Sequence, residues 1–305
     1  MMFQVLMQMA ALILCGIGWR IARPMELDAD VARRVLAGLV YTLLLPALVL
    51  DVLWKAPLGI DSGRIAIAAA CGILGAMGVA WLIYRLAKTP KTIAGALILA
   101  SAFPNATYMG LPVLEQLLGP QGRSIALQYD LFACTPILLS LGILLAAAYG
   151  ENHEQAHPLK ALLKVPPLWA ALLAIVLNLT GVSLPDGLDK WLNMLGVAVV
   201  PLMLIALGMS LQWSNWKNSY LPLLLPTLLL QLMLMPLIVM NVAEWIGITG
   251  DLLVGVTMEA AMPSMVLGIV LCDRYGLNTG LYAITVTLST ALTLITLPLW
   301  HGWVS

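Results

Sequence analysis

The sequence has few charged residues and no excess of either sign. Only 10% of its 305 residues are Asp, Glu, Lys or Arg, and 15 basic residues balance 15 acidic ones. A soluble domain carries about 25% charged residues, so this composition excludes a soluble enzyme and a disordered chain. Because there is no net positive charge to attract phosphates, it also excludes a nucleic-acid binder.

Residues for metal and nucleophilic chemistry are scarce as well. The four cysteines stand in or beside apolar runs, and no two of them have metal-ligand spacing. The sequence contains no phosphate-binding P-loop motif, so we expect no ATP hydrolysis by this chain. No nucleophile and base are placed together in the apolar segments. We therefore expect no enzyme, no cofactor and no bound metal.

Apolar residues are what the chain has in abundance. They make up 61% of it, and the mean hydropathy is +0.96. A helix needs about 20 apolar residues to cross a bilayer, and most hydrophobic segments here have 20–28 residues. The sequence therefore predicts an all-α polytopic protein of the inner (plasma) membrane with ten transmembrane helices. They cover residues 3–19, 32–53, 64–87, 92–118, 122–149, 159–181, 190–211, 219–246, 250–275 and 278–301.

The distribution of Lys and Arg predicts the orientation, because loops on the cytoplasmic side carry the excess of basic residues. With the N-terminus outside, eleven fall on the inner side and four on the outer side. We therefore expect both termini outside. The inner residues are Arg20, Arg23, Arg33, Arg34, Arg85, Lys88, Lys91, Lys160, Lys164, Lys217 and Arg274; the outer ones are Lys55, Arg64, Arg123 and Lys190.

The two halves of the chain have prolines at matching positions. Pro46 in the second span matches Pro201 in the seventh, and Pro104 in the fourth matches Pro263 in the ninth. Each copy has five spans, an odd number, so the second copy must lie inverted in the membrane. Inverted repeats with proline-interrupted helices at matching positions are typical of secondary transporters. The sequence thus predicts a first repeat at 1–149, a short cytoplasmic linker at 150–158 and a second repeat at 159–305.

The interrupted fourth and ninth helices are the candidate substrate site. Proline breaks a helix, and backbone groups freed inside a membrane must find partners in the protein or in a water-filled cavity. An unwound segment and the helix N-terminus that follows it suit an anion. A proline kink satisfied by neighbouring helices is the alternative. The predicted substrate-binding residues are Pro104, Asn105, Ala106, Thr107, Gly110, Met262, Pro263 and Ser264.

Two carboxylates at membrane depth are predicted to respond to protons. Glu259 stands one helical turn before Pro263, and Asp130 lies seven residues into the fifth span, which is roughly 10 Å deep. Charges at this depth are costly and line pathways or pair with partners. A carboxyl group away from water favours its neutral form. A structural hydrogen bond to a broken-helix amide is the alternative role for each.

Several stretches resemble the auxin efflux carrier family, which includes the plant PIN-type exporters, and together they cover nearly the whole chain. The pattern is strongest at 104–114 (PNATYMGLPVL) and 259–263 (EAAMP). The remaining matches are 16–23 (GIGWRIAR), 45–47 (LPA), 201–211 (PLMLIALGMSL) and 273–277 (DRYGL).

This resemblance implies the bile-acid-transporter-like fold, with the fourth and ninth helices crossing. Helices 1, 2, 6 and 7 would form a scaffold, and helices 3–5 and 8–10 a transport domain that moves as an elevator. The family implies an organic anion as substrate, such as a dicarboxylate or an auxin-like weak acid, and a homodimer through the scaffold. The short linker is typical of a compact bacterial member, for which auxin is a poor expectation.

No Lys or Arg is predicted near the middle of the membrane. We therefore expect the substrate to be recognised by neutral dipoles, namely Asn105, hydroxyl groups and helix N-termini, which also suits a weakly acidic substrate. Coupling to protons and coupling to sodium both stay open, since acidic and hydroxyl groups could serve either ion. A non-transporting receptor or sensor on the same fold is the alternative of a different class.

Overall fold

The structure is a computed structural model that describes residues 2–152, 155–211 and 220–305, with side chains from Met7 onward. Within these residues every regular element is a helix, and the one extended pairing is a single bridge between Pro104 and Ser264. Lys217, one of the basic residues predicted on the inner side, lies outside the described residues. The predicted all-α class is confirmed.

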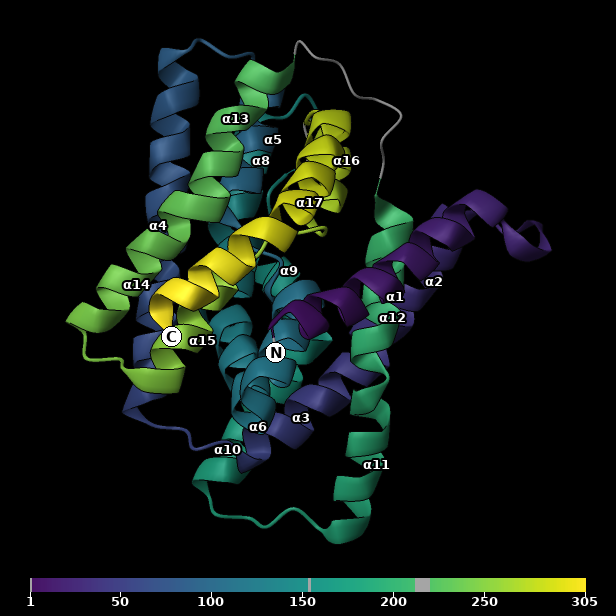
Figure 1. Cartoon of the computed structure of the whole chain (residues 1–305), viewed down its shortest axis with the longest axis vertical. Helices are drawn as coiled ribbons and strands as arrows, with labels where there is room; N and C mark the ends of the chain where they lie inside the picture. The colour runs from purple at the N-terminus through teal and green to yellow at the C-terminus, as the bar shows by residue number, and fades with distance from the viewer. Residues whose placement is uncertain (1, 153–154, 212–219) are drawn as a thin grey trace.

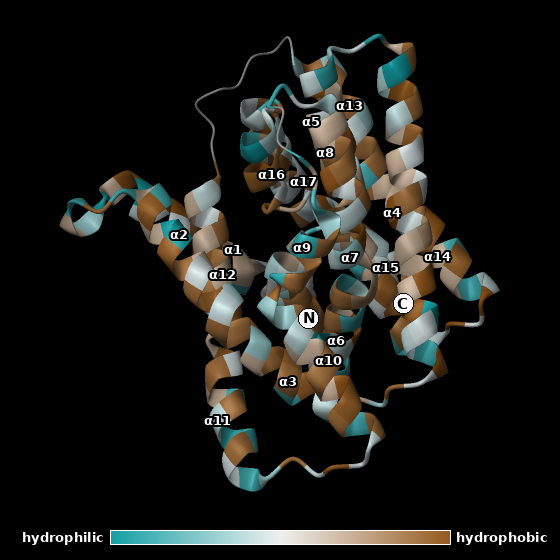
Figure 2. Ribbon diagram, turned by 180° about the vertical axis from the view of Figure 1, so that it is seen from behind, coloured by the Kyte–Doolittle hydropathy of each residue, from teal (hydrophilic) through white to brown (hydrophobic). Residues whose placement is uncertain are grey.

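In the described part of the chain, six helical stretches are long and apolar enough to cross a membrane. Hydrophobic residues dominate the ribbons, and hydrophilic ones gather at turns and helix ends (Figure 2). The count of ten crossings stays a prediction. The six stretches are Ala29–Lys55, Ile60–Leu86, Ala106–Tyr149, Asp186–Ser210, Leu221–Trp245 and Thr279–Val304; three shorter apolar helices are Met7–Ala22, Lys91–Ala102 and Pro166–Leu179.

The first half of the chain is a run of helices with π-helical turns between some of them. Its elements are α1 (Met2–Ala22), α2 (Ala29–Leu39), η2 (Val40–Leu44), α3 (Leu45–Lys55), α4 (Ile60–Leu86), α5 (Lys91–Ala102), η3 (Ala106–Gly110), α6 (Leu111–Tyr129), η4 (Asp130–Cys134), α7 (Thr135–Ile137), η5 (Leu138–Gly142) and α8 (Ile143–Tyr149).

The second half is also a run of helices and contains the π-helical turn η7. Its elements are α9 (Pro158–Leu163), α10 (Pro166–Leu179), α11 (Asp186–Val197), α12 (Val199–Ser210), α13 (Leu221–Leu229), η7 (Leu230–Leu234), α14 (Met235–Trp245), α15 (Gly250–Ala260), α16 (Gly268–Tyr275) and α17 (Thr279–Val304).

Prolines explain most of the π-helical turns. A proline lacks an N–H and its ring clashes with the carbonyl four residues earlier. Widening the preceding turn, so that an N–H reaches back five residues, relieves this clash without breaking the helix. Four π-turns, η2, η3, η4 and η7, end two residues before Pro46, Pro112, Pro136 and Pro236, respectively.

The helices pack in two groups. In the first group, α1 and α2 pack on α12, and α3 packs on α10 and α11. In the second group, α4 packs on α5 and α14, α15 packs on α6 and α14, and α17 packs on α5. Figure 1 shows α11 and α12 on one side of the molecule and α4, α13 and α14 on the other.

Glycines allow the closest crossing of the first group, that of α1 with α12. A Cβ added to Gly16 would stand 2.9 Å from the Cα of Gly208, and one added to Gly208 would stand 3.0 Å from the Cα of Gly16. Both would also strike carbonyl oxygens, those of Ile205 and Ile13. The two backbones are therefore in direct contact, which any side chain at either position would prevent.

Candidate functional site

The two interrupted helices meet at their breaks. The first break lies between α5 and η3, and the second lies between α15 and α16. The backbone N–H of Asn105 donates to the carbonyl of Pro263 at 2.7 Å, and the N–H of Met265 donates to the carbonyl of Phe103 at 2.9 Å. Each break thus supplies the hydrogen bonds that the other has lost, as a membrane requires.

Polar side chains satisfy further backbone groups at both breaks. The Ser264 hydroxyl donates to the carbonyl of Ala100 at 2.7 Å, and the Ser264 N–H donates to the Ser289 hydroxyl at 3.1 Å. From η7, the Gln231 amide donates to the carbonyl of Met262 at 2.9 Å. Residues 262–264 are fully buried, and these bonds fix the shape of the break.

A small cavity lies beside the crossing, between the two groups of helices. Its volume is about 40 Å³, which is room for about three waters at 10–15 Å³ each. The side-chain amide nitrogen of Asn105, a donor, is buried here and has no acceptor within the described residues. The lining residues are Tyr41, Leu45, Asn105, Thr107, Tyr108, Asp130, Leu131, Thr135, Leu139, Val165, Pro167, Met265 and Leu267.

Asp130 forms one wall of this cavity and accepts two hydroxyl groups. Thr107, just past the first break, donates to one carboxylate oxygen, and Thr135 donates to the other at 2.9 Å. In a π-turn, residues five apart are neighbours, so η4 brings Thr135 onto Asp130. No cation lies among the residues that line the cavity, so neutral dipoles alone hold this carboxylate there.

Glu259 is fully buried behind the crossing. Neither of its carboxylate oxygens has a hydrogen-bond partner within the described residues. The carboxylate lies against Gly110, in the space that a Cβ at position 110 would fill. An unpaired carboxylate is costly in such surroundings, and a part of Glu259 in ion coupling stays a prediction.

The structure divides the predicted substrate residues into two sets. Asn105 and Thr107 line the cavity. Pro104, Ala106, Met262, Pro263 and Ser264 belong to the crossing itself, and Gly110 faces Glu259. For all eight residues, a direct contact with substrate stays a prediction.

Sequence reasoning missed the tyrosines and glutamine of this region. Tyr41 and Tyr108 line the cavity, and Gln231 holds the second break. Tyr108 lies within the broken-helix motif, which is a signal that could have found it. Tyr41 and Gln231 come from other helices, so only the tertiary structure shows their role.

Comparison with known proteins decides the family. A family model described as "Membrane transport protein" matches residues 4–301. The chain belongs to this family, the auxin efflux carriers. The resemblance seen in the motifs is therefore confirmed, and the protein is a membrane transporter as a class.

Relatives of this transporter occur in archaea and bacteria. An "Uncharacterized transporter" of Methanothermobacter thermautotrophicus is 32% identical over 278 residues, covering 90% of this chain and 89% of the relative. The "Uncharacterized transporter MJ1031" of Methanocaldococcus jannaschii is 30% identical over 69% of this chain and 68% of its own. "Uncharacterized transporter YfdV" of Escherichia coli K12 is 23% identical over 78% and 77%.

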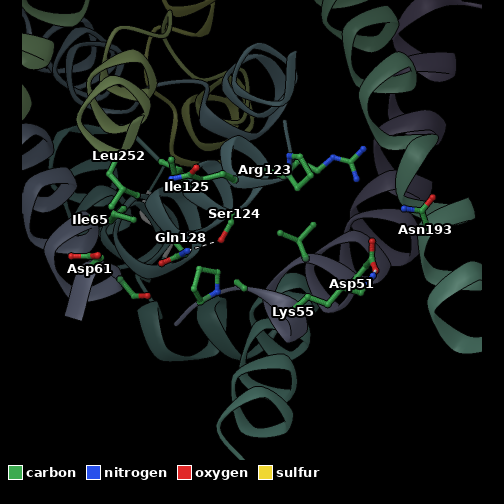
Figure 3. A pocket seen from close by; sticks show the side chains of 16 residues that line it. Asp51, Lys55, Asp61, Ile65, Arg123, Ser124, Ile125, Gln128, Asn193 and Leu252 are labelled. Atoms are coloured by element: carbon green, nitrogen blue, oxygen red, sulfur yellow. Dashed lines mark hydrogen bonds and ion pairs between the residues drawn. The ribbon is translucent and has the colours of Figure 1, made fainter. Parts of the chain in front are cut away.

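The transporter also has a wide polar vestibule, drawn in Figure 3. Its volume is about 710 Å³, and it lies between α3 and α11 of the first group and α4 and α6 of the second. On one wall, Lys55 pairs with the buried Asp51 at 2.5 Å and with Asp189 of α11. On the opposite wall, Arg123 pairs with Glu115, and the Gln128 amide donates to the Ser124 hydroxyl at 2.7 Å. The vestibule lies at the end of the molecule predicted to be outside.

A zinc-binding sequence pattern occurs in the linker, although no bound metal was expected. Residues 153–157 read HEQAH, which matches the H-E-x-x-H zinc pattern that the sequence reasoning overlooked. That pattern binds zinc when a helix puts both histidines on one face. His153 and Glu154 lie outside the described residues, and 155–157 precede α9 without helical structure. This arrangement does not fit a helical zinc site.

Proposed function

We propose that this chain is a secondary active transporter of a small organic anion, bound at the crossing of the two interrupted helices. The observation that carries the proposal is the Asn105 amide. It is a buried donor without an acceptor among the described residues, and it lines a cavity where the two groups of helices meet. A buried donor that lines a cavity can donate to whatever occupies that cavity, a water or the acceptor group of a ligand.

Ten spans in two inverted repeats are part of this proposal, and reciprocal packing supports them. The first span (α1) packs on the seventh (α12), and the sixth (α10) packs on the second (α3). Likewise α5, which lies before the first break, packs on α17 of the tenth span. In the other half, α15, which lies before the second break, packs on α6, whose last part begins the fifth span. Corresponding helices exchange partners in this way when two copies are related by a two-fold axis.

The size of the cavity supports an elevator-like movement as part of the proposal. About 40 Å³ holds water but not a dicarboxylate. Lining residues come from both groups: Tyr41 and Pro167 from the first, and Asn105 and Asp130 from the second. We propose that the second group moves against the first, which widens the cavity and exposes it to each side in turn.

The lining favours a weakly acidic substrate. It offers the Asn105 amide and two tyrosine hydroxyls but no cation, so a carboxylate would be held by hydrogen bonds alone. The candidates are a dicarboxylate and an auxin-like weak acid. A homodimer in the inner membrane, with both termini outside, completes the proposal.

Protons are the proposed coupling ion, with Glu259 or Asp130 as the carrier. The unpartnered oxygens of Glu259 support this, because protonation removes the cost of a buried charge. Sodium is the alternative, since the same oxygens could bind a cation. A receptor that binds the anion without moving it is the second alternative.

Asn105→Ala tests the site. We would reconstitute the protein in liposomes and measure uptake of labelled malonate, malate and indole-3-acetate without a gradient, with a proton gradient and with a sodium gradient. Asn241→Ala is the matched control, because its amide donates to the carbonyl of Leu237 on the exposed side of α14. We expect Asn105→Ala to lower the affinity about tenfold, the value of one hydrogen bond of about 1.4 kcal/mol. Unchanged affinity for a transported substrate would refute the placement of the site.

A further inference from the structure

Another hollow, separate from the cavity at the crossing and from the vestibule, lies where α4 turns into α5. Its volume is about 400 Å³. The end of α4, the turn after it and the first residue of α5 supply Trp81, Tyr84, Arg85, Lys88, Thr89 and Lys91, and Tyr149 at the end of α8 closes the other side.

The hollow carries a strong positive charge. Arg85, Lys88 and Lys91 line it, and no carboxylate does. Within the residues that the structure describes, none of the three forms an ion pair with an acidic side chain. The Arg85 guanidinium lies 4.8 Å from the centre of the Trp81 ring, which holds the charge at the rim of the hollow. Three cations without an acidic partner around one hollow favour the binding of an anion.

The backbone adds donors at the same place. No side chain caps the N-terminus of α5, whose N-cap residue is Pro90. The N–H groups of Ile93 and Ala94 donate to the carbonyl of Pro90 at 3.1 and 2.9 Å, which leaves those of Lys91 and Thr92 at the start of the helix. The N-terminus of a helix carries a partial positive charge that suits phosphate. Thr89 contributes a hydroxyl beside them. This donor set matches the oxygens of a phosphate group.

The hollow opens where an apolar helix ends. Ile60–Leu86 is one of the stretches able to cross a membrane, and the cations follow directly after it. Leu82 and Leu86 on the last turns of α4 are 49% and 72% exposed, so they offer apolar surface to acyl chains. Trp81 is the kind of residue found at membrane interfaces. A phosphate in the hollow would therefore lie at headgroup level, with hydrocarbon contacts just below it.

We propose that this hollow binds the phosphate headgroup of an anionic phospholipid. Arg85, Lys88 and Lys91 neutralise the phosphate, the free N–H groups of α5 and the Thr89 hydroxyl donate to its oxygens, and the acyl chains lie along α4. The site is independent of the proposed substrate site. It would bind a lipid to the turn between the third and fourth predicted spans.

The test measures lipid binding to the purified, delipidated protein by native mass spectrometry. The probes are phosphatidylglycerol, phosphatidylcholine and inorganic phosphate. The variant replaces Arg85→Gln, Lys88→Asn and Lys91→Gln together; asparagine suits position 88 because its φ is 51°. The control replaces Arg34→Gln, Lys160→Gln and Lys164→Gln, which removes the same charge from the same predicted side. Lys88→Asn alone serves if the triple variant does not fold.

We expect phosphatidylglycerol to bind the unaltered protein and the control alike. The affinity for phosphatidylglycerol should fall about fivefold in Lys88→Asn and roughly a hundredfold in the triple variant. These factors follow from a binding free energy of about 1 kcal/mol for each basic residue near an anionic surface. Equal affinity in the triple variant and the control would overturn the proposal, as would phosphatidylcholine binding as tightly as phosphatidylglycerol. Displacement of the lipid by inorganic phosphate would also overturn it, since the site would then belong to a soluble anion.

Discussion

The crossing of α1 and α12 gives a prediction whose size follows from the structure. In Gly16→Ala, the new Cβ would stand 2.9 Å from the Cα of Gly208 and 2.9 Å from the backbone nitrogen of Met209, and would strike the carbonyl of Ile205. All three obstacles are backbone atoms, so no side chain can rotate away. Because carbon atoms prefer 3.5–4.0 Å, the helices must separate by about 0.5–1 Å.

This separation has a calculable cost. A gap of 0.5–1 Å loses a quarter to a half of each contact energy along the crossing, and overpacking of this kind costs about 1–3 kcal/mol. Alanine has a higher helix propensity than glycine by about 1 kcal/mol. This gain offsets part of the packing cost. Gly18→Ala, two residues along the same helix, gains the same propensity and meets nothing within 4 Å. The difference between the two variants isolates the packing term.

The assay is chemical unfolding of the purified protein in detergent micelles. We expect the free energy of unfolding of Gly16→Ala to lie about 1–3 kcal/mol below that of Gly18→Ala. Gly208→Ala should behave like Gly16→Ala, and the double variant Gly16→Ala/Gly208→Ala should cost less than the sum, because the helices separate only once. Equal stability of Gly16→Ala and Gly18→Ala would refute the close backbone contact.

Three further predictions concern the crossing. Glu259→Gln keeps the size of the side chain but cannot exchange a proton, so we expect uptake to continue without its dependence on a proton gradient; an unchanged dependence would exclude Glu259 as carrier. Asp130→Asn removes the charge that Thr107 and Thr135 stabilise, and we expect a changed pH profile of uptake, whereas an identical profile would make Asp130 purely structural. Gln231→Leu leaves the buried carbonyl of Met262 without its donor, so unfolding measurements should show a loss of about 1–3 kcal/mol; unchanged stability would contradict this role.

Much of the fold could be predicted because a bilayer imposes simple rules. Apolar segments of about 20 residues must be helices, so the all-α membrane class followed from hydropathy. Pro104 and Pro263 stand at corresponding positions of the two halves, and each lacks an N–H and clashes with the previous turn, so the matched pair predicted two interrupted helices. Asn105 next to Pro104 could be named as a candidate because an amide at a break is free to face a cavity, which it does; its contact with substrate stays a prediction.

The finer features of the helices could not be predicted. Pro46, Pro112, Pro136 and Pro236 do not break their helices but follow π-turns. A sequence cannot distinguish these two outcomes, because the choice depends on whether neighbouring helices leave room for a wider turn. One such turn brings Thr135 onto Asp130, a contact that α-helical spacing does not predict.

By itself, the sequence determined that this protein lies in a membrane, which helices are interrupted and which family it belongs to. These properties depend on local composition, on proline geometry and on motifs that are contiguous in the chain. Only the tertiary structure decided that Asn105 lines a cavity with Tyr41 and that Gln231 holds the second break. It alone also decided that Glu259 lies against Gly110, with no partner among the described residues. The physical reason is that each of these contacts joins helices far apart in the sequence, and their register is set by packing and not by the residues of either helix alone.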